Sequence, residues 1–126
     1  YEYFKEAVLG GKKANFRLGS IDMNRGEDVV DNVAKTVSAI GYSGLAYVTD
    51  HMKALCVAPA AGKPCVKPTE QTAFDGTYPI ARPLFMYTNG EPTGEVKKYM
   101  DWIKSNTGQC IIEKEGYAPI KKVTCK

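Results

Sequence analysis

Four cysteines, Cys56, Cys65, Cys110 and Cys125, are the residues whose type and spacing most clearly predict chemistry. They form no Cys-x-x-Cys pair, and the chain has a single histidine, so the closely spaced ligand pairs of a zinc site are missing. Four cysteines allow three pairings, of which the simplest joins neighbours. Each such bridge would stabilise the fold by about 3 kcal/mol and would indicate an oxidising compartment. Four reduced, buried thiols are the alternative.

Candidates for catalysis are few. A Ser-His-Asp or Cys-His arrangement would need His51, which lies just before an expected strand and is better interpreted as an exposed loop residue. The run 10–13, Gly-Gly-Lys-Lys, lacks the spacing of a phosphate-binding loop. Glu27 and Asp28 occupy the first turn of an expected helix, where they offset its dipole. We therefore expect neither an enzyme nor a cofactor.

Tyrosines offer a further candidate surface. Four of them could stack on a sugar or a base, namely Tyr42, Tyr47, Tyr78 and Tyr87. Aromatic residues near strand ends more often belong to the core, and we expect these to do so.

The length and the net charge of the chain limit the classes of protein to which it could belong. The 126 residues suggest a single domain spanning 1–126, and the net charge of +3 is too small to indicate a nucleic-acid surface. The apolar runs are far shorter than the ~18 residues that a membrane span needs. Because the chain starts at Tyr1 without Met, we expect it to be a processed or truncated product.

Hydrophobic periodicity predicts alternating helices and short strands. We expect helices at 1–9, 24–37, 95–105 and 106–115, with shorter turns of helix at 44–48 and 69–74. We expect strands at 16–21, 39–42, 53–57 and 80–87. Asn24 and Glu27 match a capping box, and Asn106 and Gln109 could cap the last helix. This order predicts an α/β fold, an open sheet flanked by helices.

Three stretches, in this order along the chain, carry a resemblance. The first runs from the valine-rich segment at 28–33 to Ala-Ile-Gly-Tyr at 39–42, with Val-Ser at 37–38 where Pro-Gly is usual. The second combines Gly-Lys-Pro at 62–64 with Thr-Tyr-Pro-Ile-Ala-Arg-Pro-Leu at 77–84. The third joins Gly-Gln at 108–109 to Glu-Gly-Tyr-Ala-Pro-Ile at 115–120. Together they resemble the C-terminal portion of the periplasmic phosphate-binding proteins of ABC transporters.

The resemblance implies a partial type II periplasmic-binding-protein fold, one lobe plus the returning C-terminal segment. In that family a Ser-Gly-Thr loop binds the anion and precedes an aromatic-rich helix, which residues 1–6 resemble. The phosphate ligands would therefore lie upstream of Tyr1, with Tyr1 and Glu2 only adjacent to the ligand, and Arg82 would be structural. We expect no ligand site within the chain.

The same resemblance implies partners and a location. The whole receptor would capture inorganic phosphate for an ABC permease, in the periplasm or outside the cell, whereas the isolated chain would bind weakly or not at all. Apolar surface left uncovered could produce a homodimer. The alternative is an interaction or sensory domain that uses the same fold without a ligand site.

Overall fold

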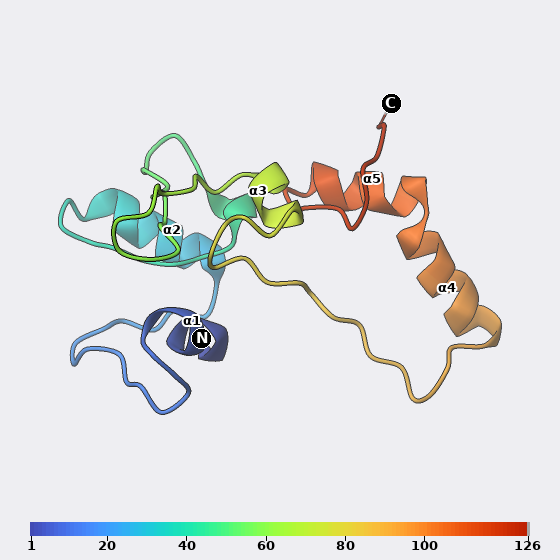
Figure 1. Ribbon diagram of the computed structural model, residues 1–126, viewed down its shortest axis with the longest axis horizontal. Helices are drawn as coiled ribbons and strands as arrows, with labels where there is room; N and C mark the ends of the chain where they lie inside the picture. Colours follow the sequence, from blue (N-terminus) through green and yellow to red (C-terminus); the bar gives the residue numbers. More distant parts are fainter. Residues whose placement is uncertain (126) are drawn as a thin grey trace.

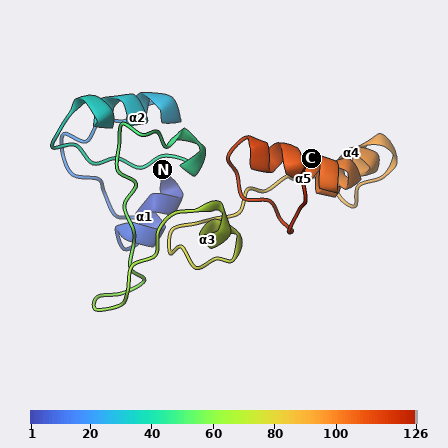
Figure 2. The same ribbon diagram turned by 90° about the horizontal axis from the view of Figure 1, so that it is seen from above.

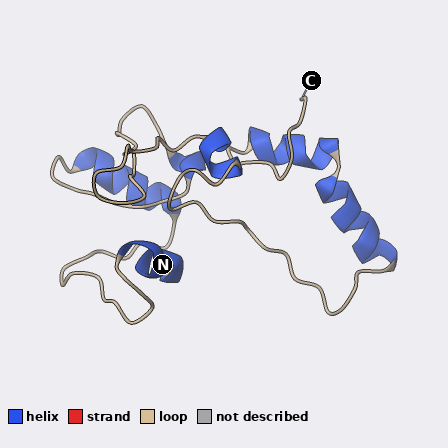
Figure 3. Cartoon of the chain, viewed as in Figure 1, coloured by secondary structure: helices blue, strands red, loops and turns tan. Residues whose placement is uncertain are grey.

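Helices separated by long loops make up the structure, a computed structural model that describes residues 1–125 (Figures 1 and 3). The helices are α1 Glu2–Val8, α2 Gly26–Lys35, α3 Glu70–Phe74, α4 Gly94–Lys104 and α5 Asn106–Lys114, and a 3₁₀ turn, η1, covers Leu45–Tyr47. Every predicted helix is present, with its ends shifted by one or two residues. The amphipathic pattern was sufficient because a helix satisfies its hydrogen bonds within its own segment.

Two predicted caps are wrong. The N-cap of α2 is Arg25, not Asn24, and no side chain caps this helix. The Glu27 carboxylate, which a capping box would direct back to the backbone, instead pairs with the Arg25 guanidinium. The N-cap of α5 is Ser105, whose hydroxyl accepts a 3.2 Å hydrogen bond from the Gly108 amide. Asn106 and Gln109 therefore serve other contacts.

The four predicted strands are not formed in the described part of the chain. Residues 16–21, 39–42, 53–57 and 80–87 lie in irregular or extended backbone, and the one ladder contact is an isolated antiparallel bridge between Val57 and Val66. A strand needs a neighbour to pair its amides and carbonyls, and apart from the Val57–Val66 bridge no ladder joins these segments to another described segment. The helices of the predicted α/β fold are thus observed without its open sheet.

The chain divides into two parts (Figures 1 and 2). One part holds α1, α2, η1 and α3, and the other holds α4 and α5, which meet at a bend. A long extended segment after α3 leads out to α4. The chain then returns along α5, and just beyond its end Gly116 lies so close to Ala46 of η1 that a Cβ at Gly116 would be 3.0 Å from it.

Few residues are buried. In the described chain they are Val30 of α2, Gly108 and Gln109 of α5, and Pro119. The accessible surface is 10201 Å², whereas a compact chain of this length exposes about 6,600 Å². Much of the apolar surface that the sequence provides for a core therefore faces solvent.

Candidate functional site

Tyr1 and Glu2, predicted to lie beside the ligand, form the exposed start of α1. The Tyr1 ring centre is 4.8 Å from that of Phe16, and the Lys5 ammonium lies 5.5 Å from the Tyr1 ring centre. The Glu2 carboxylate lies 3.7 Å from the same ammonium, and no side chain caps the helix. Both residues therefore make local contacts with α1 and the loop beside it.

An aromatic cluster holds α1 against the loops that follow it. Phe4 stacks on Tyr42, with ring centres 4.0 Å apart and planes within 9° of parallel, and Phe16 lies 5.9 Å from Tyr42. Burial raises the pKa of the Tyr42 hydroxyl, and the negative charge of Asp22 raises it further. Tyr42 thus packs against other aromatic rings, but it is 38% exposed and Tyr87 is 88% exposed, so the prediction of a core position is wrong for both.

A second contact fixes α1 to the segment after α3. The Tyr3 hydroxyl donates a 2.7 Å hydrogen bond to the Ala81 carbonyl, and the Arg82 guanidinium lies 5.8 Å from the centre of the Tyr3 ring. These interactions join residues 78 positions apart in the chain. Arg82 consequently packs on the side of α1.

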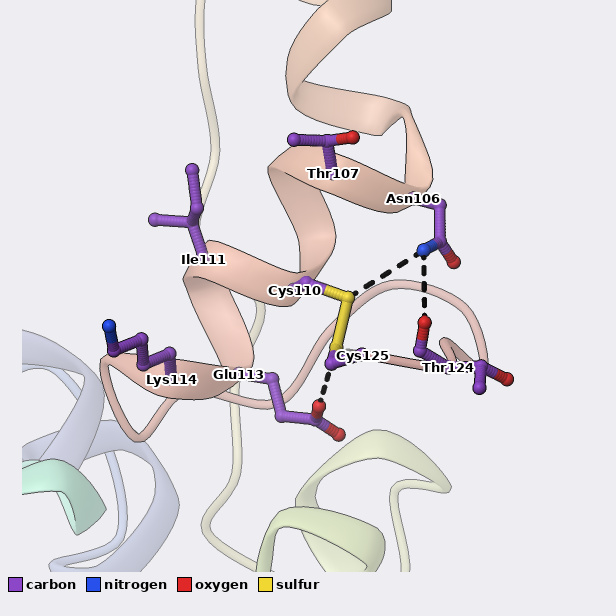
Figure 4. Close-up of a pocket in the computed structure, with 8 residues that line it drawn as sticks. All are labelled: Asn106, Thr107, Cys110, Ile111, Glu113, Lys114, Thr124 and Cys125. Carbon is purple, nitrogen blue, oxygen red and sulfur yellow. Dashed lines mark hydrogen bonds between the residues drawn. A yellow bond between two sulfur atoms is a disulfide. The ribbon is translucent and has the colours of Figure 1, made fainter.

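Two disulfides pair the cysteines as neighbours, Cys56 with Cys65 and Cys110 with Cys125. The first closes a loop beside the Val57–Val66 bridge. The second joins the C-terminal tail to α5 (Figure 4). The simplest of the three pairings is therefore the one present, and none of the four cysteines is free.

A surface hollow with a volume of about 670 Å³ surrounds the second disulfide (Figure 4). Two of its polar side chains contact the C-terminal tail. The Asn106 amide donates to the Thr124 carbonyl at 3.2 Å, and a Glu113 carboxylate oxygen lies 3.0 Å from the Cys125 sulfur. A smaller hollow, about 420 Å³, lies between α2 and the loops at 17–23 and 38–41. Both are open to solvent.

No cluster of three or more His, Cys, Asp or Glu side chains suitable for a metal exists within residues 1–125. His51 is exposed, as the sequence predicts. None of the described helices combines the length and the apolar character that crossing a membrane requires.

The sequence predicted that Gln109 could cap the last helix, but in the structure it is a buried residue that links neighbouring segments. Its side chain is 1% exposed and joins three parts of the C-terminal region. Its amide nitrogen donates to the Ile103 carbonyl of α4, and its oxygen accepts from the Ile120 amide of the tail, both at 2.8 Å. The only sequence signal was its place in the Gly-Gln pair of the third motif.

Known proteins provide close comparisons. A family model described as a PBP superfamily domain matches residues 2–107. The phosphate-binding protein PstS of Pseudomonas aeruginosa is 35% identical over 124 residues, which cover 95% of this chain and 38% of that protein. PstS of Bacillus subtilis is 37% identical over 90 residues, covering 70% of this chain and 28% of that protein.

A further relative carries a different name. Protein SphX of Synechococcus elongatus is 29% identical over 127 residues, covering 95% of this chain and 36% of that protein. This chain thus spans less than two fifths of the length of these curated relatives. No solved structure matches it significantly. The match over residues 2–107 shows that this chain belongs to the PBP superfamily domain family.

Proposed function

We propose that this chain is part of a substrate-binding protein that captures inorganic phosphate and delivers it to an ABC importer. The observation that carries the proposal is the 35% identity to a phosphate-binding protein over 95% of the chain. The three sequence motifs support it independently, because they follow the order expected for such a receptor. The PstS relatives are named as phosphate-binding proteins, and we propose no catalytic role.

We further propose that the isolated chain binds phosphate weakly or not at all. A phosphate receptor encloses its anion with backbone amides, hydroxyls and an arginine between two closing lobes. The hollow beside the second disulfide and the one beside α2 are both open to solvent, and in the first of them Asn106 and Glu113 contact the C-terminal tail. Under this proposal Tyr1 and Glu2 lie beside the anion and other parts of the receptor supply its ligands.

Two of the segments predicted as strands fit the same proposal. Residues 39–42 and 80–87 are mostly apolar and take part in no strand ladder. We propose that they become strands of an open sheet when the remaining segments of a longer receptor provide neighbours. The 126 residues would then form most of one α/β domain.

The two disulfides support a location in the periplasm or outside the cell. Disulfides persist in oxidising compartments and are rare in the cytosol. Both bridges close short loops, with the joined cysteines 9 and 15 positions apart in the sequence. They therefore fit a binding protein that meets phosphate before it crosses the membrane.

Calorimetric titration of phosphate into this chain tests the weak-binding part of the proposal. We expect no saturable heat with phosphate, and the same result with sulfate as a matched anion. One-to-one binding of phosphate with a micromolar dissociation constant would contradict the proposal, because it would require a complete site within these residues.

An interaction or sensory domain is the second candidate. The large exposed apolar surface favours it, since such surface commonly marks a contact with another protein. Phosphate binding by a longer form of the protein, matching its PstS relatives in length, discriminates the receptor from the interaction or sensory domain. Failure of that longer form to bind phosphate would favour the interaction domain.

A further inference from the structure

The segment from Arg82 to Pro92 is unusual because its backbone is unpaired. No backbone hydrogen bond joins residues 82–92 to any other described residue. The apolar side chains in its centre are exposed, with exposed fractions of 69% for Leu84, 66% for Phe85, 54% for Met86 and 88% for Tyr87. Unpaired amides and exposed apolar side chains thus coincide in one segment.

This segment has the geometry of a strand without a partner. The ring centres of Phe85 and Tyr87, two positions apart, lie 6.3 Å from each other. Such a distance fits an extended backbone, in which residues two positions apart share a face. Leu84 and Met86 then occupy the opposite face. An exposed edge of this kind is a template for pairing with another chain.

The chain as a whole exposes more surface than a compact chain of its length, by more than the area that one typical interface buries. The chain exposes 10201 Å², about 3,600 Å² more than a compact chain of its length. A stable interface typically buries about 800 Å² on each partner. This excess is spread over the whole chain, and the exposed side chains of Leu84, Phe85, Met86 and Tyr87 contribute to it.

We propose that a second copy of this chain pairs with residues 84–88 in antiparallel orientation, about a twofold axis at Met86. In this register Phe85 of each copy lies opposite Tyr87 of the other, which creates two aromatic cross-strand pairs. The segment 84–88 carries no charge, so the pairing brings no like charges together. This inference does not depend on phosphate binding.

The ends of the segment favour the antiparallel orientation. Arg82 lies before it and Glu91 lies after it. Antiparallel pairing brings the Arg82 end of one copy toward the Glu91 end of the other, whereas parallel pairing would place Arg82 beside Arg82. Pro83, which has no amide, and the hydrogen bond from the Thr88 hydroxyl to the Gly90 carbonyl limit the pairing to this stretch.

Sedimentation velocity across a range of concentrations tests the proposal. We expect a monomer–dimer equilibrium, and Phe85→Lys or Tyr87→Lys should weaken it by about tenfold or more, because symmetry makes each substitution act twice. Val37→Lys is the matched control, since Val37 is fully exposed outside the segment, and it should leave the equilibrium unchanged. A monomer at all concentrations, or association that Phe85→Lys and Tyr87→Lys do not change, would overturn the proposal.

Hydrogen exchange keeps the proposal testable if a lysine variant fails to fold. In the unchanged chain, the amides of residues 84–88 should exchange more slowly as the protein concentration rises, while those of the loop at 59–63 should not change. Rapid, concentration-independent exchange at 84–88 would exclude pairing through this segment. That result would leave these residues free for other parts of a longer receptor.

Discussion

Gln109 is the single residue on which the C-terminal region most depends. Its amide group bonds to α4 on one side and to the tail on the other, although it is almost completely buried. A buried side-chain amide must find partners for both its donor and its acceptor. Here it finds two backbone groups in segments that otherwise have little contact.

Replacing Gln109 by Leu should destabilise the α4–α5 region by about 1–3 kcal/mol, because the Ile103 carbonyl and the Ile120 amide would lose their partner. Chemical denaturation followed by circular dichroism measures the change. Gln71→Leu is the matched control: Gln71 is exposed on α3, with only a 3.4 Å bond to Asp75, so the same substitution there should have little effect. Equal effects at the two sites would contradict the assigned role of Gln109.

Asp75 provides a prediction about pH. The Thr77 hydroxyl donates to its carboxylate at 2.6 Å and the Thr77 amide donates at 2.9 Å, and these bonds lower the pKa of Asp75. Thr77→Val removes the hydroxyl donor, so the pKa of Asp75 should rise toward its ordinary value in an NMR titration. Thr88→Val, which removes a hydroxyl bonded to a carbonyl instead, should leave this pKa unchanged.

The sign of the linked stability effect follows from the lowered pKa. The ionised carboxylate is favoured in the folded chain, so its stabilisation is present above the pKa of the unfolded chain. It is lost as the pH falls through the lower pKa of the folded chain. Because Asp75 is fully exposed, solvent screens its charge and keeps this effect on stability small. The Thr77→Val variant and the unchanged chain should therefore differ little in stability at acidic pH. The NMR titration is therefore the decisive measurement at this site.

At the scale of elements, the bend between α4 and α5 depends on a glycine. A Cβ added at Gly108 would lie 2.5 Å from the backbone oxygens of Trp102 and Ile103. Ser105 ends α4 and caps α5, so the two helices follow each other without a loop. The close approach at Gly108 lets α5 turn back across the end of α4.

Gly108→Ala should therefore cost about 1–3 kcal/mol, since the methyl group can be accommodated only by moving backbone. The free energy of unfolding in urea tests this expectation. Thr107→Ala, an exposed substitution next to it in α5, should stay close to the unchanged chain. A Gly108→Ala variant as stable as the unchanged chain would show that the bend does not need a glycine.

Helices could be predicted from the sequence and strands could not, for a physical reason. The faces of α2 and α4 repeat every three to four residues, and the hydrogen bonds of each helix are local. Segment 80–87 has the apolar character of a strand, but pairing depends on a neighbour that no local pattern encodes. The neighbour pairing of the cysteines was predictable from spacing, whereas the contacts of Gln109 depend on how α4, α5 and the tail meet.

At the scale of the whole molecule, the unusual feature is how little of its apolar surface is buried. Apolar side chains on α4, including Val96, Tyr99 and Trp102, face solvent to about half of their surface. The apolar residues in the sequence are sufficient for a core, but their partners are missing from the described chain. This agrees with a chain that spans under two fifths of the length of its relatives.

The proposed ligand site also belongs to this scale. The small net charge gave no indication of a nucleic-acid surface and the cysteine spacing argued against zinc, but neither could identify an anion. Phosphate was predicted from the order of three motifs, and the similarity to PstS supports that prediction. Which side chains contact phosphate depends on how two lobes close, a property that no single segment of this chain contains.

The most direct test compares phosphate binding by this chain with binding by a longer form of the protein that matches its PstS relatives in length. The account predicts saturable, one-to-one phosphate binding by the longer form and none by the 126-residue chain in the same calorimetric titration. Micromolar binding by the 126-residue chain, or no binding by the longer form, would contradict it.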